Sequence, residues 1–207
     1  MVPWSLPCST MRRVAGRSAA ELRSLPDKPG DLNRIEEHTL FRITRSIWQG
    51  PFASRQRLTD LRGAAITHIV NVGESPSQLT EADGPFRKVL WVPVEDLVII
   101  PTDAAIRCVD AVHRCVCDGD TNLYVHCVAG WNRSPTVLWL YLVACGIESA
   151  TAKSWIASAS YDAVPAHPRL IDEALVRAIC RYGENEFRPH PRPTALEPVN
   201  TAELGSG

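Results

Sequence analysis

The chain has little of what membrane, metal-binding and disulfide-linked proteins require. No apolar run reaches the roughly twenty residues of a membrane span, so no span is expected. Its seven cysteines are an odd number without a convincing secretory signal, which predicts reduced thiols and a cytoplasmic, reducing compartment. Cys115 and Cys117 lack zinc-site spacing and the six histidines form no helical ligand pair. Neither a metal nor a cofactor is therefore predicted.

An excess of positive charge is absent too. Lysine and arginine number 22 against 23 aspartates and glutamates, which gives a net charge of -1. This balance gives no support for a nucleic-acid partner bound through bulk charge, although a local basic pocket remains open. The length of 207 residues, 45% apolar and 22% charged, predicts one globular domain with tails.

The two ends of the chain differ from its centre. Residues 1–36 contain several arginines, serines and prolines and predict a flexible extension. The same arginine-rich, acid-poor composition also fits an organellar transit peptide. Residues 184–207 are rich in proline and charge without periodicity, which predicts a disordered tail. The folded domain is therefore expected over residues 37–183.

Strand-like and helix-like patterns alternate through the centre, and helices follow one another toward its end. This order predicts an α/β fold with a central, mainly parallel sheet flanked by helices and a site at the carboxyl ends of its strands. The expected strands are 40–44, 46–50, 66–72, 88–94 and 122–127, and the expected helices are 54–63, 102–117, 136–145, 149–159 and 169–182.

The most informative stretch joins the last strand to the helix that follows it. Leu123 to Val125 favour a strand, and Gly130 permits a tight turn. Ser134 followed by Pro135 predicts a helix start, with Ser134 as the N-cap. Cys127 is therefore expected at the mouth of a helix.

Five residues separate Cys127 from Arg133, enough to curl the backbone into a ring of inward N–H groups that holds one anion. The helix terminus and Arg133 favour the thiolate over the thiol at Cys127, which makes it a nucleophile. A guanidinium can grip two phosphoryl oxygens at once with its planar fork. A phosphate group fits this pattern.

The order His126-Cys127-x-x-Gly130-x-x-Arg133-Ser134 resembles the signature of the cysteine-dependent protein tyrosine phosphatase superfamily, and the short length resembles its dual-specificity branch. The resemblance implies that residues 37–183 form a catalytic domain that hydrolyses phosphomonoesters, such as phosphorylated proteins, through a cysteinyl phosphate without a metal. His126 would tune the thiolate or only fill its strand end, and Ser134 would assist the leaving thiolate besides capping its helix. The phosphate-binding residues would be Val128, Ala129, Gly130, Trp131, Asn132 and Arg133.

A general acid is needed to protonate the leaving oxygen. Asp96 follows the strand 88–94, and Pro93-Val94-Glu95-Asp96 resembles the acid segment of the dual-specificity family. Glu95 and Asp103 are the alternatives, although an acid such as Asp103 in the first turn of a helix is explained by the helix dipole.

Asn71 ends the expected strand 66–72. By the same resemblance it would brace the phosphate loop, and a turn-forming asparagine is the alternative interpretation.

The loop residues between Cys127 and Arg133 do not identify the substrate. They add no lysine, a residue that inositol-lipid phosphatases of this superfamily often carry there, and Trp131 offers an aromatic lip. Residues 130–133 also resemble the Gly-aromatic-Asn-Arg loop of cysteine-dependent RNA 5'-triphosphatases. Asp96 and the near-neutral charge favour the phosphomonoester interpretation over that one. A weakly active phosphate-binding module is the alternative from another functional class.

Overall fold

A computed structural model of the chain describes residues 40–197 and 199, and its centre is a five-stranded sheet in the order β1-β2-β5-β3-β4. The strands β2, β5, β3 and β4 are mutually parallel, and only β1 runs antiparallel, to β2. This confirms the predicted mainly parallel α/β fold. The strands are β1 (Phe41–Arg42), β2 (Ile47–Gly50), β3 (His68–Asn71), β4 (Lys88–Trp91) and β5 (Leu123–His126).

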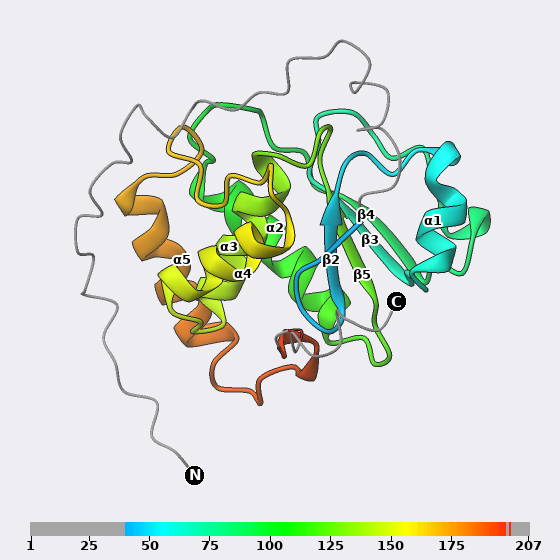
Figure 1. Cartoon of the computed structure of the whole chain (residues 1–207). Coiled ribbons are helices and arrows are strands. Elements are labelled where there is room, and N and C mark those ends of the chain that lie inside the picture. The colour runs from blue at the N-terminus through cyan, green and yellow to red at the C-terminus, as the bar shows by residue number, and fades with distance from the viewer. Residues whose placement is uncertain (1–39, 198, 200–207) are drawn as a thin grey trace. The chain divides into compact units, whose positions relative to one another are not determined.

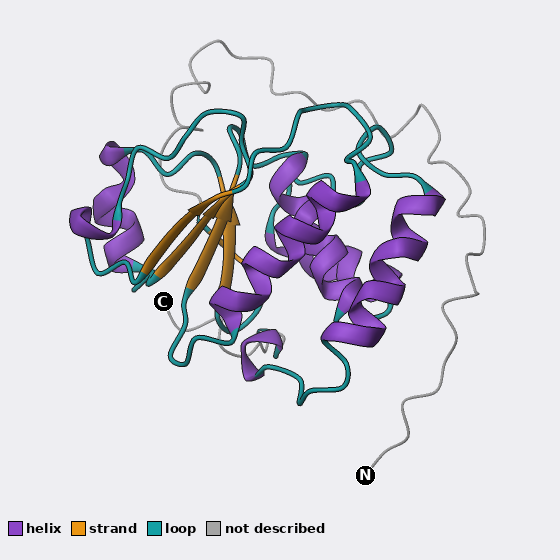
Figure 2. Ribbon diagram, turned by 180° about the vertical axis from the view of Figure 1, so that it is seen from behind, coloured by secondary structure: helices purple, strands orange, loops and turns teal. Residues whose placement is uncertain are grey.

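Helices cover both faces of the sheet, as the view from behind shows (Figure 2). The short helix α1 (Leu58–Gly63), which continues the 3-10 turn η2 (Arg55–Arg57), lies on one face. The longer helices lie on the other face (Figure 1): α2 (Thr102–Val116), α3 (Arg133–Ala144), α4 (Ser149–Ala159) and α5 (Glu173–Glu186). Two further 3-10 turns are η3 (Glu81–Asp83) and η4 (Thr194–Leu196).

Helix α3 is the centre of the core, because all 12 of its residues are buried. Its side chains are apolar nearly all round, so every face of the helix finds a packing partner. The helix begins at Arg133 with Asn132 as the N-cap, and no side chain caps it. The prediction that Ser134 is the N-cap is therefore wrong. Ser134 and Pro135 lie in the first turn, where backbone N–H groups need no partner within the helix, so a proline is tolerated.

The chain beyond Gly183 also differs from the sequence prediction. Helix α5 continues to Glu186, and Ala195 and Leu196 are buried. The hydroxyl of Thr44 donates a hydrogen bond to the carbonyl of Ala195 at 2.6 Å. Residues 184–197 are thus part of the folded domain, although their sequence lacks periodicity, because the end of α5 and the turn η4 pack onto it and the connection between β1 and β2 bonds to residues 195–197. The predicted extension over residues 1–36 lies outside the described residues.

A search of the described residues for membrane-spanning helices finds none of sufficient length and hydropathy.

Candidate active site

The carboxyl ends of three neighbouring strands meet at one edge of the sheet. The register places Gly50 of β2 and Asn71 of β3 on either side of His126, the last residue of β5. Cys127 follows His126 directly, and the polypeptide then turns into α3, whose first residue is Arg133. The predicted loop therefore lies at the edge where loops after β3, β4 and β5 gather (Figure 1).

The loop between Cys127 and Arg133 turns at Gly130, which has a φ of +80°. A Cβ atom at Gly130 would lie 2.6 Å from the carbonyl carbon of Gly50, so the loop rests directly on β2. The buried side-chain amide of Gln49 in β2 donates a hydrogen bond to the carbonyl of Gly130. Glycine is required here by both the backbone conformation and the close approach.

Carbonyl groups of this loop bond to elements outside it. Phe52 donates its N–H to the carbonyl of Val128, and Val164 donates to that of Trp131, both at 2.8 Å. In a trans peptide the next N–H points away from the carbonyl. Outward carbonyls at Val128, Gly130 and Trp131 therefore turn the following N–H groups toward the centre of the loop, the arrangement that anion-binding backbone nests use.

Cys127 lies beneath this ring of N–H groups and is 2% exposed. The hydroxyl of Ser134 donates to its Sγ at 3.5 Å. The two side chains come from opposite ends of the loop, and the first turn of α3 brings the hydroxyl back over the sulfur. The structure thus gives Ser134 a contact with Cys127 in place of the predicted cap.

His126 contacts the backbone of Cys127 rather than its sulfur. Its Nδ1 lies 3.0 Å from the Cys127 carbonyl oxygen, to which a protonated Nδ1 donates. Burial lowers the pKa of His126 to about 4, so the ring is neutral near pH 7. Tyr124 stacks on the ring and Phe52 meets it edge-on. His126 can therefore orient Cys127, but it brings no positive charge to it.

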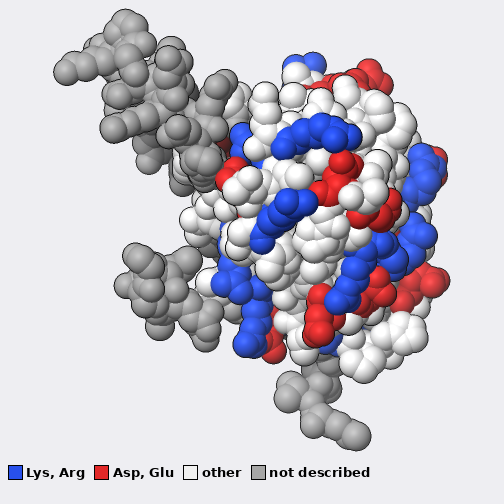
Figure 3. All heavy atoms as spheres, turned by 90° about the vertical axis from the view of Figure 1, so that its right-hand side faces the viewer, with Lys and Arg blue, Asp and Glu red and all other residues white. Residues whose placement is uncertain are grey.

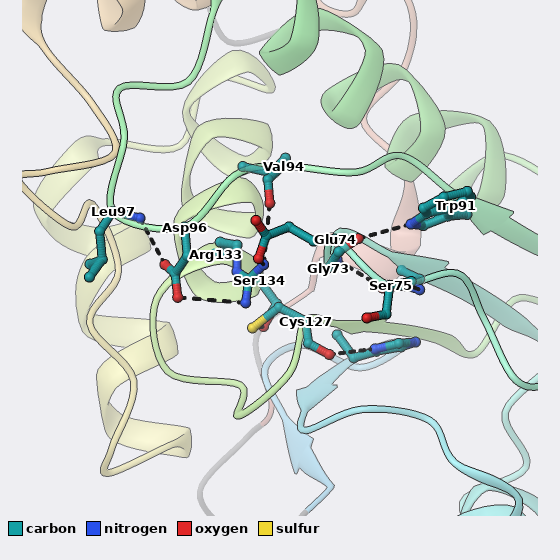
Figure 4. A network of polar contacts seen from close by, with 12 residues as sticks. Gly73, Glu74, Ser75, Trp91, Val94, Asp96, Leu97, Cys127, Arg133 and Ser134 are labelled. Carbon is teal, nitrogen blue, oxygen red and sulfur yellow. Dashed lines mark hydrogen bonds and ion pairs between the residues drawn. The ribbon is translucent and has the colours of Figure 1, made fainter.

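Arg133 is 4% exposed, and its guanidinium lies between two carboxylates (Figure 4). Its Nη1 donates to Glu74 Oε2 at 3.1 Å and to the carbonyl of Val94 at 3.3 Å. Its Nη2 forms a looser ion pair with Asp96 Oδ2 at 3.5 Å. Within the described part of the chain its buried Nε has no partner. The edge formed by Nε and Nη2, whose one contact is the looser pair with Asp96, is therefore the one best placed to grip two oxygens of an anion.

Of the three candidate acids, Asp96 is the one that the structure places against Arg133. The carboxylate of Asp96 is 34% exposed and accepts the N–H of Leu97 at 3.0 Å. Glu95 points into solvent. Asp103 forms an exposed ion pair with Arg107 at 2.6 Å, and the hydrogen bond from Arg107 lowers the pKa of Asp103.

Asn71 holds a different segment from the one predicted. Its amide donates to the carbonyl of Ser75 at 2.8 Å, and its oxygen accepts the N–H of Gly73 at 2.8 Å. A Cβ atom at Gly73 would lie 3.4 Å from the carbonyl carbon of Cys127, so this segment packs beside Cys127. Asn71 thus shapes the turn that carries Glu74, and its contacts with the phosphate loop are indirect.

Sequence reasoning missed Glu74 and Gln49. Glu74 lies three residues after Asn71, and its position after a strand parallel to β5 was the available signal. Gln49 is a fully buried amide next to a Gly-Pro turn, in a strand otherwise lined by apolar residues. A buried polar side chain needs a partner, which makes it a signal for a tertiary hydrogen bond.

Comparisons with known proteins point to one family. A family model described as "Swiss Army Knife protein, DSP-PTPase phosphatase domain" matches residues 50–174. Dual specificity protein phosphatase 15 from Homo sapiens is 32% identical over 102 residues, which cover 49% of this chain and 33% of that protein. The protein of the same name from Rattus norvegicus is 31% identical over 103 residues, which cover 49% of this chain and 42% of it. The match therefore spans less than half the length of these relatives.

Solved structures share the fold. The crystal structure of human DUSP28 has a TM-score of 0.54 at 24% identity and covers 70% of this chain and 96% of its own. The crystal structure of DUSP15 has a TM-score of 0.52 at 23% identity, and the match covers 70% of this chain and 88% of that one. The crystal structure of PTPMT1 has a TM-score of 0.54 at 15% identity, and the match covers 70% of this chain and 94% of that one.

Proposed function

The chain belongs to the dual-specificity phosphatase-like branch of the cysteine-dependent protein tyrosine phosphatase superfamily, and we propose that it hydrolyses phosphomonoesters through a cysteinyl phosphate at Cys127. The observation that carries this proposal is the meeting of four groups, three from the stretch 127–134 and one from the segment after β4. Ser134 lies on the sulfur of Cys127, and Asp96 lies against Arg133.

In the first step, the thiolate of Cys127 attacks phosphorus and the bond to the leaving oxygen breaks. The Nε and Nη2 atoms of Arg133 hold two phosphoryl oxygens, and N–H groups of the loop stabilise their charge. Asp96, in its acid form, gives its proton to the leaving oxygen. The alcohol or phenol departs and the phosphoryl group remains on sulfur.

In the second step, a water molecule attacks the phosphorus of the cysteinyl phosphate. The carboxylate of Asp96 accepts a proton from this water, which restores the acid for the next cycle. The phosphorus–sulfur bond breaks and its electrons return to Cys127. The hydroxyl of Ser134, which lies 3.5 Å from that sulfur, donates to the departing thiolate. Inorganic phosphate is released, and no step requires a metal.

The substrates proposed are phosphorylated proteins, with phosphotyrosine first and phosphoserine or phosphothreonine second. Beyond the resemblance of residues 130–133, nothing in the described residues favours the RNA 5'-triphosphatase alternative. On the face that carries η2 and α1, cations and carboxylates are mixed (Figure 3), and Arg55 pairs with Asp83 at 3.1 Å. That face offers no continuous basic track for an RNA backbone.

Hydrolysis of p-nitrophenyl phosphate in excess chelator tests the proposal. The wild-type protein and a Cys117→Ser variant, which changes an exposed thiol elsewhere, should both be active. The Cys127→Ser variant should be inactive while still binding inorganic phosphate. If all three proteins bind phosphate without turning over the ester, the chain is a phosphate-binding module and the proposal is wrong.

A further inference from the structure

Exposed apolar side chains gather on the segments around the candidate site. We call five of them the apolar rim, and each is at least 40% exposed: Val98, Ile99, Val128, Trp131 and Val164. Exposed apolar groups are unremarkable singly, but a group of them around a site marks a binding surface.

Backbone hydrogen bonds join the segments that carry the apolar rim. The N–H of Val164 donates to the carbonyl of Trp131 at 2.8 Å, which ties the α4–α5 connection to the phosphate loop. The N–H of Ile100 donates to the carbonyl of Leu170 at 2.9 Å, which ties the same connection to the segment after Asp96. The rim residues therefore lie on one connected surface rather than on unrelated loops.

The same surface is acidic. Its segments are residues 73–78, 94–101, 128–132 and 161–169, and their basic residues are Arg169 and His167. The segment after β2, which Phe52 joins to Val128, adds Arg57 and Arg55, the latter in an ion pair with Asp83. The carboxylates of the four segments are Glu74, Glu95, Asp96 and Asp162. The side chain of Glu74 is 59% exposed even though it pairs with Arg133. The buried Arg133 supplies positive charge at the bottom of the site, whereas the mouth around it carries an excess of negative charge.

We propose that this mouth selects phosphorylated side chains with apolar or basic neighbours and rejects those with acidic neighbours. The inference rests on the proposed function and adds the substrate class. Apolar residues next to the phosphorylated one bury surface against the rim. Acidic residues there meet Glu95 and Glu74, and this repulsion supplies specificity by excluding the wrong partner.

Charge favours a peptide over a lipid surface as the occupant. An apolar rim could in principle enter a bilayer, but a membrane that carries phosphomonoester lipids presents many negative charges at once. The carboxylates of Glu74, Glu95 and Asp162 would face that surface and be repelled by it. A single phosphorylated side chain in an uncharged or basic peptide brings one anion, which Arg133 can hold.

The test compares kcat/KM for three phosphotyrosine peptides that share a length and a central residue and carry Leu/Val, Arg or Asp/Glu flanks. We expect the apolar and basic peptides to exceed the acidic one by about tenfold or more, which corresponds to about 1.4 kcal/mol. An Ile99→Ser, Val164→Ser double variant should lower kcat/KM for the apolar peptide and leave p-nitrophenyl phosphate hydrolysis unchanged.

Charge variants test the other half of the inference. Glu95→Gln should raise kcat/KM for the acidic peptide by about threefold, roughly the effect of one screened like-charge contact. Glu173→Gln, which alters an exposed carboxylate on α5, should leave it unchanged.

The inference is overturned if kcat/KM is highest for the acidic peptide, or if it is equal for the three peptides. It is also overturned if the protein hydrolyses a phosphomonoester lipid in vesicles faster than the apolar peptide and the rim double variant lowers that lipid activity. If p-nitrophenyl phosphate is not hydrolysed, the proposed function fails separately. In that case the affinities of the Cys127→Ser variant for the same three peptides test the inference. It predicts tighter binding of the apolar and basic peptides than of the acidic one.

Discussion

Three glycine-to-alanine substitutions separate backbone strain from steric collision at the phosphate loop. Gly130 and Gly119 both have positive φ values, +80° and +72°. A Cβ atom at Gly119 would have no heavy atom within 4 Å, whereas one at Gly130 would lie 2.6 Å and 2.8 Å from the carbonyl carbon and oxygen of Gly50. Gly63, at the end of α1, has open space and no positive φ.

The expected magnitudes follow from these differences. Gly63→Ala should stabilise the protein by up to about 1 kcal/mol, because alanine is favoured over glycine in a helix. Gly119→Ala should destabilise it by about 1–2 kcal/mol through the left-handed conformation alone. Gly130→Ala adds about 1–3 kcal/mol of overpacking, so about 2–5 kcal/mol in all. Gly50 cannot move away easily, since β2 pairs with β5.

Denaturant unfolding measures the stability of each variant, and p-nitrophenyl phosphate hydrolysis measures its activity. Gly130→Ala should also lower kcat/KM by about 10²-fold, since a shift of about 1 Å in a positioning group can have that effect. Gly119→Ala should keep wild-type kcat/KM. If Gly119→Ala and Gly130→Ala destabilise the protein equally and Gly130→Ala remains active, the reasoning is wrong. The loop between Cys127 and Arg133 would then relax around the new methyl group, and its contact with β2 would not position it.

Other predictions concern charge, pH and the C-terminal segment. Arg133→Lys, which loses the guanidinium fork, should lower kcat/KM by about 10²–10³-fold, whereas Arg107→Lys in an exposed ion pair should not change it. Folding lowers the pKa of His126 from 6.5 to about 4, so the unfolded chain binds a proton on His126 more readily than the folded protein. The free energy of unfolding should therefore decrease by about 3 kcal/mol as pH falls from 6.5 to 4. The decrease should be smaller in the His126→Phe variant. Acid unfolding curves that coincide for the two proteins would contradict this. Leu196→Ala should destabilise the domain by about 2–5 kcal/mol, whereas Glu197→Ala, which removes an exposed ion pair with Arg45, should change unfolding by less than about 1 kcal/mol.

Local patterns were enough to predict the elements of this fold. The helix expected over residues 149–159 is α4 with the same bounds, and the strand and helix on either side of Cys127 are β5 and α3. Local patterns succeeded because each of these elements packs in the core, α4 against α3 and α3 against β5. They failed at residues 184–197, where Ala195 and Leu196 are buried in the short 3-10 turn η4. The Thr44 hydroxyl and the Arg45 N–H hold this turn by donating to the carbonyls of Ala195 and Glu197, and such contacts leave no periodic pattern in the sequence.

The sequence by itself determined the loop that we propose as the reaction centre, because Cys127, Gly130 and Arg133 lie within seven residues and their spacing already implies a closed loop. Tertiary structure alone decided which other groups reach it. Glu74 contacts Arg133 across 59 residues of chain and Gln49 contacts Gly130 across 81. The same applies to Asp96, which spacing could not separate from Glu95 and Asp103. Contacts between segments so far apart depend on strand order and register, and these arise from packing of the whole sheet rather than from any local pattern.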